Sequence, residues 1–252
     1  MAVCMKRIQM EAAISEPTLI TYAGRLDPMA EGLVIFLVGE MRFKKEQYLK
    51  LDKEYHTQFF LGVETDTYDV LGIIRSVKVG GFRVDIGQVS KQISQFQTLG
   101  TFEQAFPPFS SRKILGKPLF KYAREQIHDV PLEKHRVTLS HVSLIKIQNQ
   151  DTESLISEII TDIFRVDGDF RQISIEQSWL NYRKEIPNQV TLFNVILRVS
   201  SGFYVRQWVH DLGNYLKTGA VTVSIQRTKI GYFDITMLKG KTFRIFSLNE
   251  LE

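Results

Sequence analysis

The sequence is poor in the features that mark secreted, membrane-spanning and zinc-binding proteins. Its 252 residues include one cysteine, Cys4, which cannot form a disulfide within the chain. The longest purely apolar run, Leu33 to Val38, falls far short of the roughly 20 residues that span a bilayer. The N-terminus has no apolar signal segment, and the five histidines never fall at the spacing of a zinc site. These absences predict a cytoplasmic protein without disulfides or a metal centre.

Common catalytic and cofactor motifs are missing as well. No Gly-x-Ser-x-Gly elbow occurs, which excludes a serine hydrolase of that type. We therefore expect neither a metal nor an organic cofactor, and we expect a monomer. A formal net charge of +4 favours an anionic partner only weakly.

What the chain has is ample material for a core, with 44% hydrophobic and 11% aromatic residues. Apolar runs and period-2 patterns predict strands at 33–38, 54–61, 137–147 and 193–199. Helical spacing predicts helices at 89–96 and 203–217. Strands with helices scattered between them predict an α+β fold, a mixed and largely antiparallel sheet flanked by helices.

Two groups of basic residues are interleaved with aromatic ones, at 42–53 and 112–124. Such a mixture can neutralise phosphates and stack on bases. Either group taken alone is also compatible with an ordinary solvated helix face. The groups therefore suggest a nucleic-acid partner without establishing one.

One loop stands out as a candidate site, Gly24-Arg25-Leu26-Asp27-Pro28-Met29-Ala30-Glu31-Gly32, directly before the longest apolar run. Pro28 biases Asp27 toward an extended conformation, and the glycines allow a tight loop against a sheet. The loop should hold one carboxylate at the end of a sheet. Asp-Pro is also a common turn former, so the loop alone does not define chemistry.

This loop resembles the Gly-Thr-Leu-Asp-Pro-x-Ala-x-Gly motif of the TruB-type tRNA pseudouridine synthases. Four later segments resemble further motifs of that family in the same order; they lie at 53–72, 107–124, 200–213 and 219–231. Among them, Ser200-Ser201-Gly202-Phe203-Tyr204-Val205-Arg206 is similar to Ser-Lys-Gly-Thr-Tyr-Ile-Arg. The resemblance covers roughly residues 22–147 and 190–251 and implies the pseudouridine synthase catalytic fold.

The resemblance also implies a reaction and its residues. The family cuts the N1 glycosidic bond of a uridine, turns the base and rejoins it through C5, which needs no cofactor. Asp27 should be the catalytic carboxylate, kept ionised by Arg206. Tyr55 should stack on the flipped uracil and assist proton removal at C5. Tyr204 and Ile225 match positions that wall the uracil pocket.

Other positions should contact the RNA around that pocket. Tyr22 replaces a family histidine that helps to open the T-loop, and an aromatic ring could stack there. Arg25 replaces the family threonine and should lie beside the flipped nucleotide. The residues expected nearest phosphates are Arg42, Lys44, Lys113 and Arg227.

The substrate implied is the T-arm of tRNA, at the uridine of position 55 in tRNA numbering. Two alternatives remain open. Gly-Arg-Leu-Asp is also found in ribosomal-RNA-modifying pseudouridine synthases, so the enzyme could act on another RNA such as rRNA. The chain could instead be a non-catalytic tRNA-binding or tRNA-folding module. We expect a single catalytic domain over 1–252, with an insertion at 149–189 and without the C-terminal PUA domain of many relatives.

Overall fold

The computed structural model describes residues 20–78, 85–127, 130 and 133–238. Its centre is a seven-stranded sheet, in which six strands follow one another in a single order and the seventh, β2 (Ala30–Gly32), pairs with β12 (Ala220–Ile230). In spatial order the series is β13 (Phe233–Asp234), β12 (Ala220–Ile230), β4 (Lys53–Leu61), β11 (Gln189–Val199), β10 (Lys134–Asp151) and β7 (Thr101–Ala105). All of these pairings are antiparallel, and only β2 (Ala30–Gly32) runs parallel to its partner among the described strands of the sheet. The predicted α+β class with a mixed, largely antiparallel sheet is confirmed.

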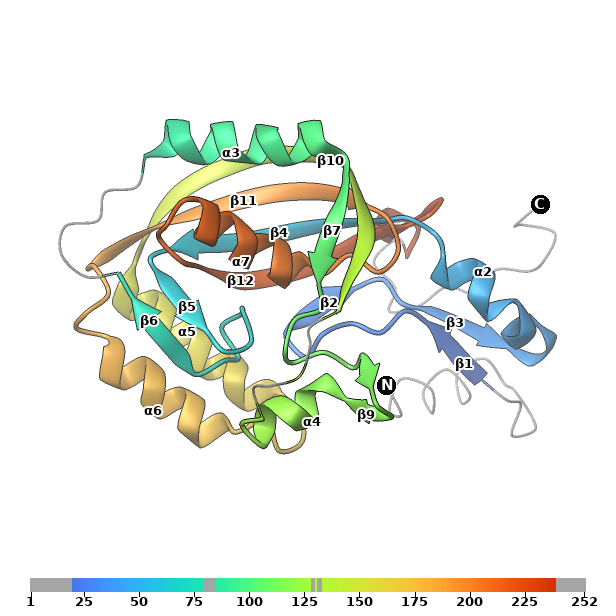
Figure 1. The fold of residues 1–252 in the computed structure, drawn as a ribbon, viewed down its shortest axis with the longest axis horizontal. Helices are drawn as coiled ribbons and strands as arrows, with labels where there is room; N and C mark the ends of the chain where they lie inside the picture. Colours follow the sequence, from blue (N-terminus) through green and yellow to red (C-terminus); the bar gives the residue numbers. More distant parts are fainter. Residues whose placement is uncertain (1–19, 79–84, 128–129, 131–132, 239–252) are drawn as a thin grey trace.

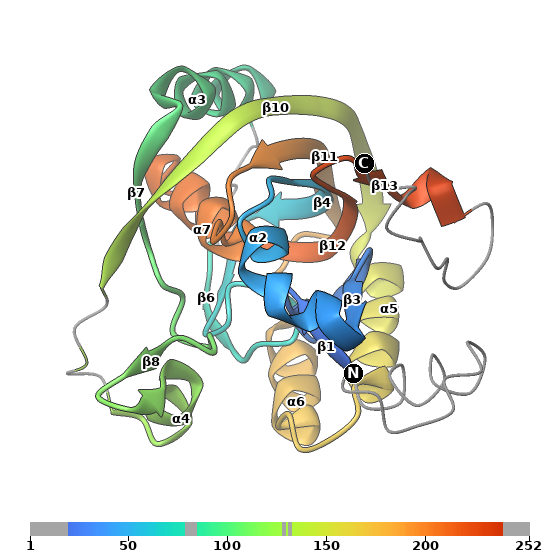
Figure 2. The same ribbon diagram turned by 90° about the vertical axis from the view of Figure 1, so that its right-hand side faces the viewer.

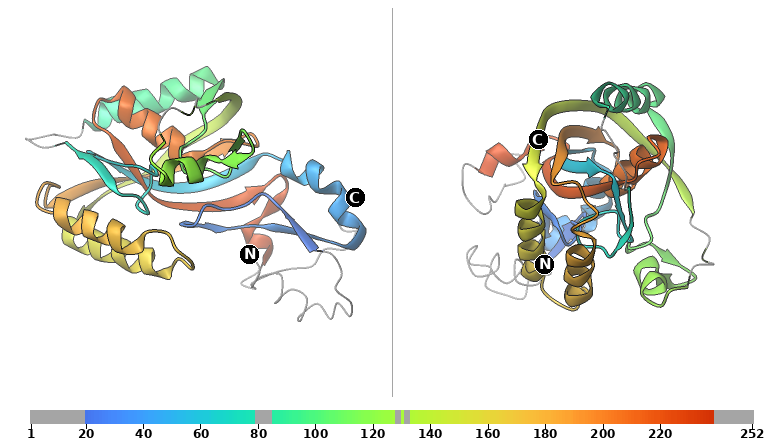
Figure 3. Two further views of the ribbon diagram at one scale, coloured as in Figure 1. Left: turned by 60° about the horizontal axis from the view of Figure 1, so that its bottom comes forward. Right: turned by 90° about the vertical axis from the view of Figure 1, so that its left-hand side faces the viewer.

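Helices cover both faces of this sheet (Figure 1). On one face lie α3 (Ile86–Leu99) and α7 (Val205–Tyr215), and on the other lie α5 (Thr152–Arg165) and α6 (Gln172–Tyr182). The left view of Figure 3 shows α5 and α6 side by side as a layer under the strands. Because successive side chains of a strand point to opposite faces, one strand feeds both layers. Phe59 and Phe60 of β4 accordingly belong to different hydrophobic clusters.

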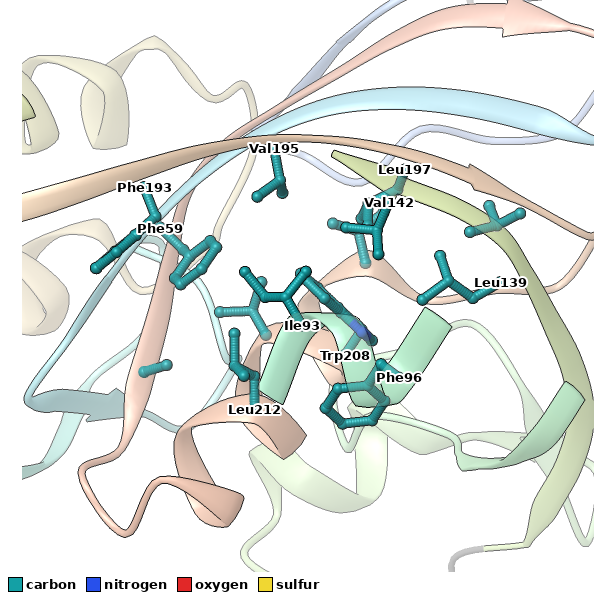
Figure 4. Close-up of a cluster of buried hydrophobic side chains, with 14 of the residues drawn as sticks. Phe59, Ile93, Phe96, Leu139, Val142, Phe193, Val195, Leu197, Trp208 and Leu212 are labelled. Carbon is teal, nitrogen blue, oxygen red and sulfur yellow. The ribbon is translucent and has the colours of Figure 1, made fainter. Parts of the chain in front are cut away.

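The first cluster lies between the sheet and the α3–α7 layer (Figure 4). Trp208 of α7 is fully buried at its centre, with its ring centroid 6.2 Å from that of Phe59 and 5.9 Å from that of Phe96. Both contacts have edge-to-face geometry, which aromatic rings favour. This packing fixes α7 against the sheet, and α7 carries Arg206 in its first turn.

The second cluster lies on the opposite face and includes the apolar sides of α5 and α6. Asp151 begins α5 by accepting a hydrogen bond from the Ser154 amide at 2.9 Å, a normal N-cap. Trp179 of α6 is fully buried and donates its indole N–H to the Val70 carbonyl at 3.1 Å. The 149–189 segment therefore supplies core residues, and its helices pack on the sheet.

Smaller elements surround the sheet. They are β1 (Ile20–Ala23), β3 (Ile35–Val38), η1 (Gly39–Lys44), α2 (Lys45–Leu49), β5 (Val63–Thr65), β6 (Ile74–Val77), β8 (Lys113–Ile114), β9 (Lys117–Pro118), α4 (Leu119–Arg124) and η2 (Ile235–Leu238). Figure 2 shows the β1–β3 ribbon with α2 beside it, and α4 with β8 set apart from the sheet. None of the helices in the described ranges is long and apolar enough to cross a bilayer.

The run Leu33–Val38 differs from the fully buried strand that its composition predicts. Its strand portion is β3, which pairs with β1 in a separate two-stranded ribbon. Within β3 only Leu37 is buried. A two-stranded ribbon outside the main sheet lacks the second layer that would cover both of its faces, so its apolar side chains stay half-exposed.

Candidate active site

The Asp27 loop runs from the end of β1 to β2, which lies alongside β12. A backbone hydrogen bond from Ala30 to the Asp27 carbonyl, 2.9 Å long, closes a turn around Pro28. Gly32 has φ of 105°, and a Cβ there would lie 2.3 Å from the Arg227 carbonyl oxygen. Only glycine allows β2 to approach β12 this closely. The turn leaves the Asp27 side chain 34% exposed.

The first turn of α7 is held by the neighbouring strand β7. Gln104 is buried on that strand and forms two hydrogen bonds with the N-cap residue Tyr204. Its Oε1 accepts from the Tyr204 amide at 2.8 Å, and its Nε2 donates to the Tyr204 carbonyl at 3.1 Å. This clamp fixes where the helix begins and hence the direction of Arg206, two residues later.

Arg206 joins Asp27 to two other loops. Its Nε donates to Asp27 Oδ2 at 2.8 Å, its Nη1 donates to the Thr67 carbonyl at 2.6 Å, and its Nη2 reaches the Phe109 carbonyl at 3.4 Å. The side chain is only 2% exposed. Burial alone would lower the pKa of Arg206, but the charges of Asp27 and Asp69 outweigh it and raise that pKa. The guanidinium is therefore always charged, and it forms an ion pair with the Asp27 carboxylate.

Asp69 is a second acid at this arginine, and sequence reasoning gave it no role. Its Oδ2 lies 3.4 Å from Arg206 Nε, and its Oδ1 accepts from Thr67 Oγ1 at 2.6 Å and from the Leu71 amide at 3.0 Å. Burial raises the pKa of Asp69 to about 6, against the opposing effect of Arg206. The sequence does carry one indication of this burial, because Asp69 is followed directly by the apolar residues Val70 and Leu71.

Replacing Asp69 by asparagine is expected to change the pH dependence of stability. The folded protein keeps the Asp69 proton up to about pH 6, whereas an unfolded aspartate loses it near pH 4. Ionisation of Asp69 therefore lowers the free energy of unfolding as the pH rises between these values. Relative to wild type, Asp69→Asn should gain roughly 2 kcal/mol on going from pH 4 to pH 7.

Urea unfolding of both proteins at the two pH values measures this gain. Asp162→Asn, which changes an exposed aspartate of α5, is the matched control and should show no such gain. A stability difference between wild type and Asp69→Asn that is the same at both pH values would show that Asp69 titrates like an ordinary aspartate.

Tyr55 lies on β4 at the position paired with Arg227 of β12. It is half-buried and packs against the first hydrophobic cluster. Burial raises the pKa of Tyr55, the nearby Asp27 charge raises it further, and Arg227 opposes both. Tyr55 is therefore a neutral phenol within electrostatic reach of Asp27.

Arg227 is not where we expected it. Instead of facing outward toward phosphates it is 1% exposed. Its Nε donates to the Leu33 carbonyl at 2.7 Å and its Nη2 to the Gly24 carbonyl at 3.0 Å. The expectation of a phosphate contact at Arg227 is wrong, because its donors are directed inward and hold the two ends of the Asp27 loop together.

The two residues expected to wall the uracil pocket lie at the borders of this site. Burial and the Asp27 charge raise the pKa of Tyr204, with Arg206 opposing. The Tyr204 ring also packs edge-on against Phe106 at 5.8 Å between centroids. Ile225 is buried and pairs with Ala30 of β2, directly beyond the Asp27 turn.

The remaining predicted contacts are on the outside of the site. Arg25 is exposed and bridges two segments, since its Nη2 donates to the Tyr22 hydroxyl at 3.1 Å and its Nη1 to Ser111 Oγ at 3.3 Å. Arg42 on η1 stacks its guanidinium 4.4 Å from the ring centroid of Phe43, which is 70% exposed.

Two lysines complete this outer set. Lys44 follows on η1, and Lys113 lies on β8. Both side chains are exposed, so their positive charges are open to solvent.

Comparison with known proteins places this chain in a family. The sequence matches the TruB family pseudouridylate synthase (N terminal domain) over residues 13–159, more than half of the chain. The chain belongs to the TruB family. Family membership agrees with the five ordered motifs in the sequence.

Individual TruB-family relatives extend the match. The tRNA pseudouridine synthase B of Chlamydia muridarum (strain MoPn / Nigg) is 31% identical over 220 residues, covering 86% of this chain and 70% of the relative. That of Endomicrobium trichonymphae is 28% identical over 214 residues, covering 85% of this chain and 74% of the relative. That of Protochlamydia amoebophila (strain UWE25) is 31% identical over 216 residues, covering 85% and 64%.

A solved structure shows the same fold at low sequence identity. The crystal structure of a Cbf5-Nop10-Gar1 complex aligns with a TM-score of 0.52 and 13% identity, covering 96% of this chain and 53% of that one. The alignment spans almost the whole chain, so the predicted catalytic fold is confirmed for this TruB-family protein.

Proposed function

We propose that this chain isomerises uridine to pseudouridine in the T-arm of tRNA, in the cytoplasm, with Asp27 as the catalytic carboxylate. The observation that carries the proposal is the ion pair between Asp27 and buried Arg206 in a TruB-family chain. Relatives named tRNA pseudouridine synthase B support the choice of tRNA. Isomerisation neither adds nor removes atoms, so the site needs no oxidant or group donor.

The chemistry requires an ionised carboxylate beside the ribose. The N1–C1′ bond breaks, the base turns, a C5–C1′ bond forms, the C5 proton leaves and N1 gains a proton. A carboxylate can attack the sugar or accept a proton, and both roles require Asp27 to be charged. Arg206 holds this carboxylate in an ion pair 2.8 Å long. The partial exposure of Asp27 leaves it open to substrate.

Tyr55 is the residue that contacts the base in this proposal. Its ring is available to stack on the turned uracil, since aromatic faces accept any base. Because its pKa is raised, the phenol is neutral at pH 7 and is a poor base in its own right. We assign Tyr55 the stacking role. Removal of the C5 proton then needs another group as the base, and Tyr55 only assists that step. Tyr204 and Ile225 border the same space as pocket walls.

RNA must present the uridine unstacked, which loops allow more cheaply than duplexes. Arg25 is exposed and donates a hydrogen bond to the half-buried Tyr22, so both side chains lie beside the Asp27 loop, where the flipped nucleotide would enter. Arg42, Lys44 and Lys113 then supply positive charge for the flanking phosphates. Arg227 belongs instead to the support of the Asp27 loop.

Neutralising Arg42 and Lys44 together to glutamine is expected to weaken tRNA binding and to flatten its salt dependence. Each lost phosphate contact should reduce the slope of log binding constant against log salt concentration by roughly 0.7 on a loop substrate. Titrations at several salt concentrations measure the slope. Arg165→Gln with Lys184→Gln, two exposed cations of the 152–186 segment, is the charge-matched control.

The control pair should leave affinity nearly unchanged, because this segment also carries many acidic residues. Substitution is preferable to deletion of 152–186, since its helices fill the second hydrophobic cluster. If the control pair weakened binding more than Arg42→Gln with Lys44→Gln, the 152–186 segment would be the surface that holds tRNA.

The whole chain is, in this proposal, one catalytic domain into which residues 149–189 are inserted. Support comes from the shared sheet, because both hydrophobic clusters use side chains of β4, β11 and β12. The inserted helices therefore have no separate core of their own among the described residues.

Chemical mass-tagging of pseudouridine in RNA from a strain lacking this protein tests the function. We expect the tag at the T-loop uridine of tRNA to disappear. Persistence of that tag with loss of a ribosomal site would support the alternative that Arg25 suggests, a ribosomal-RNA enzyme. No change in any RNA would favour a binding module without catalysis.

A further inference from the structure

The connection between α5 and α6 reaches the loops that hold the active-site arginine. Arg171, at the start of α6, forms a bidentate ion pair with Asp66 through its two terminal guanidinium nitrogens. Its Nη1 donates to Asp66 Oδ2 at 2.7 Å and its Nη2 to Oδ1 at 3.3 Å. The Asp66 side chain is 5% exposed and also accepts from the Ile73 amide at 2.9 Å. A forked, charge-assisted pair of this kind fixes both partners in direction as well as distance.

The same guanidinium also contacts a second loop. Its central carbon lies 4.5 Å from the ring centroid of Phe109, a cation–π contact. Arg171 itself has φ of 64°, a left-handed conformation that is uncommon for a residue with a long side chain. A residue held in that conformation needs surroundings that fix it, and the two contacts on its side chain provide them.

Both loops that Arg171 contacts also accept a hydrogen bond from Arg206 through a backbone carbonyl. The residue after Asp66 is Thr67, whose carbonyl accepts from Arg206 Nη1, and the carbonyl of Phe109 itself lies 3.4 Å from Arg206 Nη2. Arg171 therefore ties together the two backbone acceptors that set the orientation of Arg206. The forked pair directs two of the five guanidinium N–H donors of Arg171 at a buried carboxylate, and the side chain is only 23% exposed.

We propose that Arg171 is a positioning residue for the Arg206–Asp27 pair, supplied by the inserted segment. The proposal rests on the proposed function. The inserted helices bring Arg171 to the site, where its guanidinium keeps the 65–72 loop and Phe109 at the spacing that Arg206 requires. Phosphate binding by Arg171 is the competing role, and the test separates the two.

Arg171→Met and Arg171→Lys test the proposal, with Arg165→Met on α5, a 74%-exposed arginine, as the matched control. Arg171→Met removes the fork and the charge, and should lower kcat roughly tenfold while the Kd for tRNA stays within about twofold. Arg171→Lys keeps one charged contact, should fold, and should recover part of kcat. Arg165→Met should match wild type in both.

Amide hydrogen exchange gives a readout that does not need turnover. The Ile73 and Leu71 amides donate to Asp66 and Asp69, so both should exchange faster in Arg171→Met and unchanged in Arg165→Met. If wild-type protein converts no uridine but exchange responds as stated, the proposed function fails and the positioning contact stands. Unchanged kcat in folded Arg171→Met, unchanged exchange, or a loss of tRNA affinity as large as the loss of rate would overturn the proposal.

Discussion

Replacing Asp27 by asparagine is expected to reduce uridine isomerisation at least about a thousandfold. Asparagine has nearly the same shape but can neither attack the ribose nor accept a proton at neutral pH. Because the substitution adds no bulk to the loop, tRNA binding should stay within a few-fold of wild type. Initial rates on a tRNA transcript and equilibrium binding to the same transcript measure the two quantities.

Asp162→Asn, with its exposed side chain on α5, is the control and should retain full activity. A rate for Asp27→Asn within tenfold of wild type would show that another group carries the reaction. If wild type were equally inactive on a cognate transcript, the non-catalytic binding module would be the better account.

Replacing Arg206 by methionine should have the second-largest effect, because it acts on stability and rate together. The substitution leaves Asp69 buried without its cation and frees the carbonyls of Thr67 and Phe109. Removing one partner of a buried ion pair typically costs about 3 kcal/mol. Turnover should be lost as well, since Asp27 loses its ion pair and the two loops lose their common donor.

A double-mutant cycle separates these causes. Adding Asp69→Asn to Arg206→Met should recover part of the free energy of unfolding, because no uncompensated carboxylate then remains at that position. It should recover no turnover. Equal stability of wild type and Arg206→Met in urea unfolding, or no recovery in the double variant, would contradict the buried network around Arg206.

The sequence predicted the parts of this molecule that depend on local pattern. Period-2 and helical spacing located β4, β11 and α7, and the Gly24–Gly32 loop was expected to be tight for reasons that the structure bears out. Ordered motifs then singled out Asp27 and Arg206, which the structure brings within 2.8 Å of each other. Their catalytic roles remain predictions.

Arg227 shows what a local pattern cannot supply. The pairing of β12 with β4 shifts register between Thr222 and Ser224 and again between Arg227 and Lys229. Each irregularity changes which face the following side chains occupy. A basic residue in such a strand cannot be assigned to solvent or interior by alternation, and Arg227 proved to be interior.

Asp69 and Arg171 were missed for a different reason. Each acts through partners far away in the sequence, Arg206 for Asp69 and Asp66 for Arg171. Such pairs depend on how the 65–72 loop and the α5–α6 connection meet in space, and composition alone does not specify that. The burial of the run at 33–38 was overestimated similarly, because its cover depends on which strands it joins.

Release of the C5 hydrogen tests the central claim most directly, since isomerisation must expel it. A tRNA transcript made with uridine tritiated at C5 is incubated with wild-type protein, and tritium in water is counted. We predict release equivalent to one uridine per tRNA, lost when the T-loop uridine is replaced by cytidine and lost with Asp27→Asn. Release that persists after the T-loop substitution, or no release from the unaltered transcript, would contradict the account.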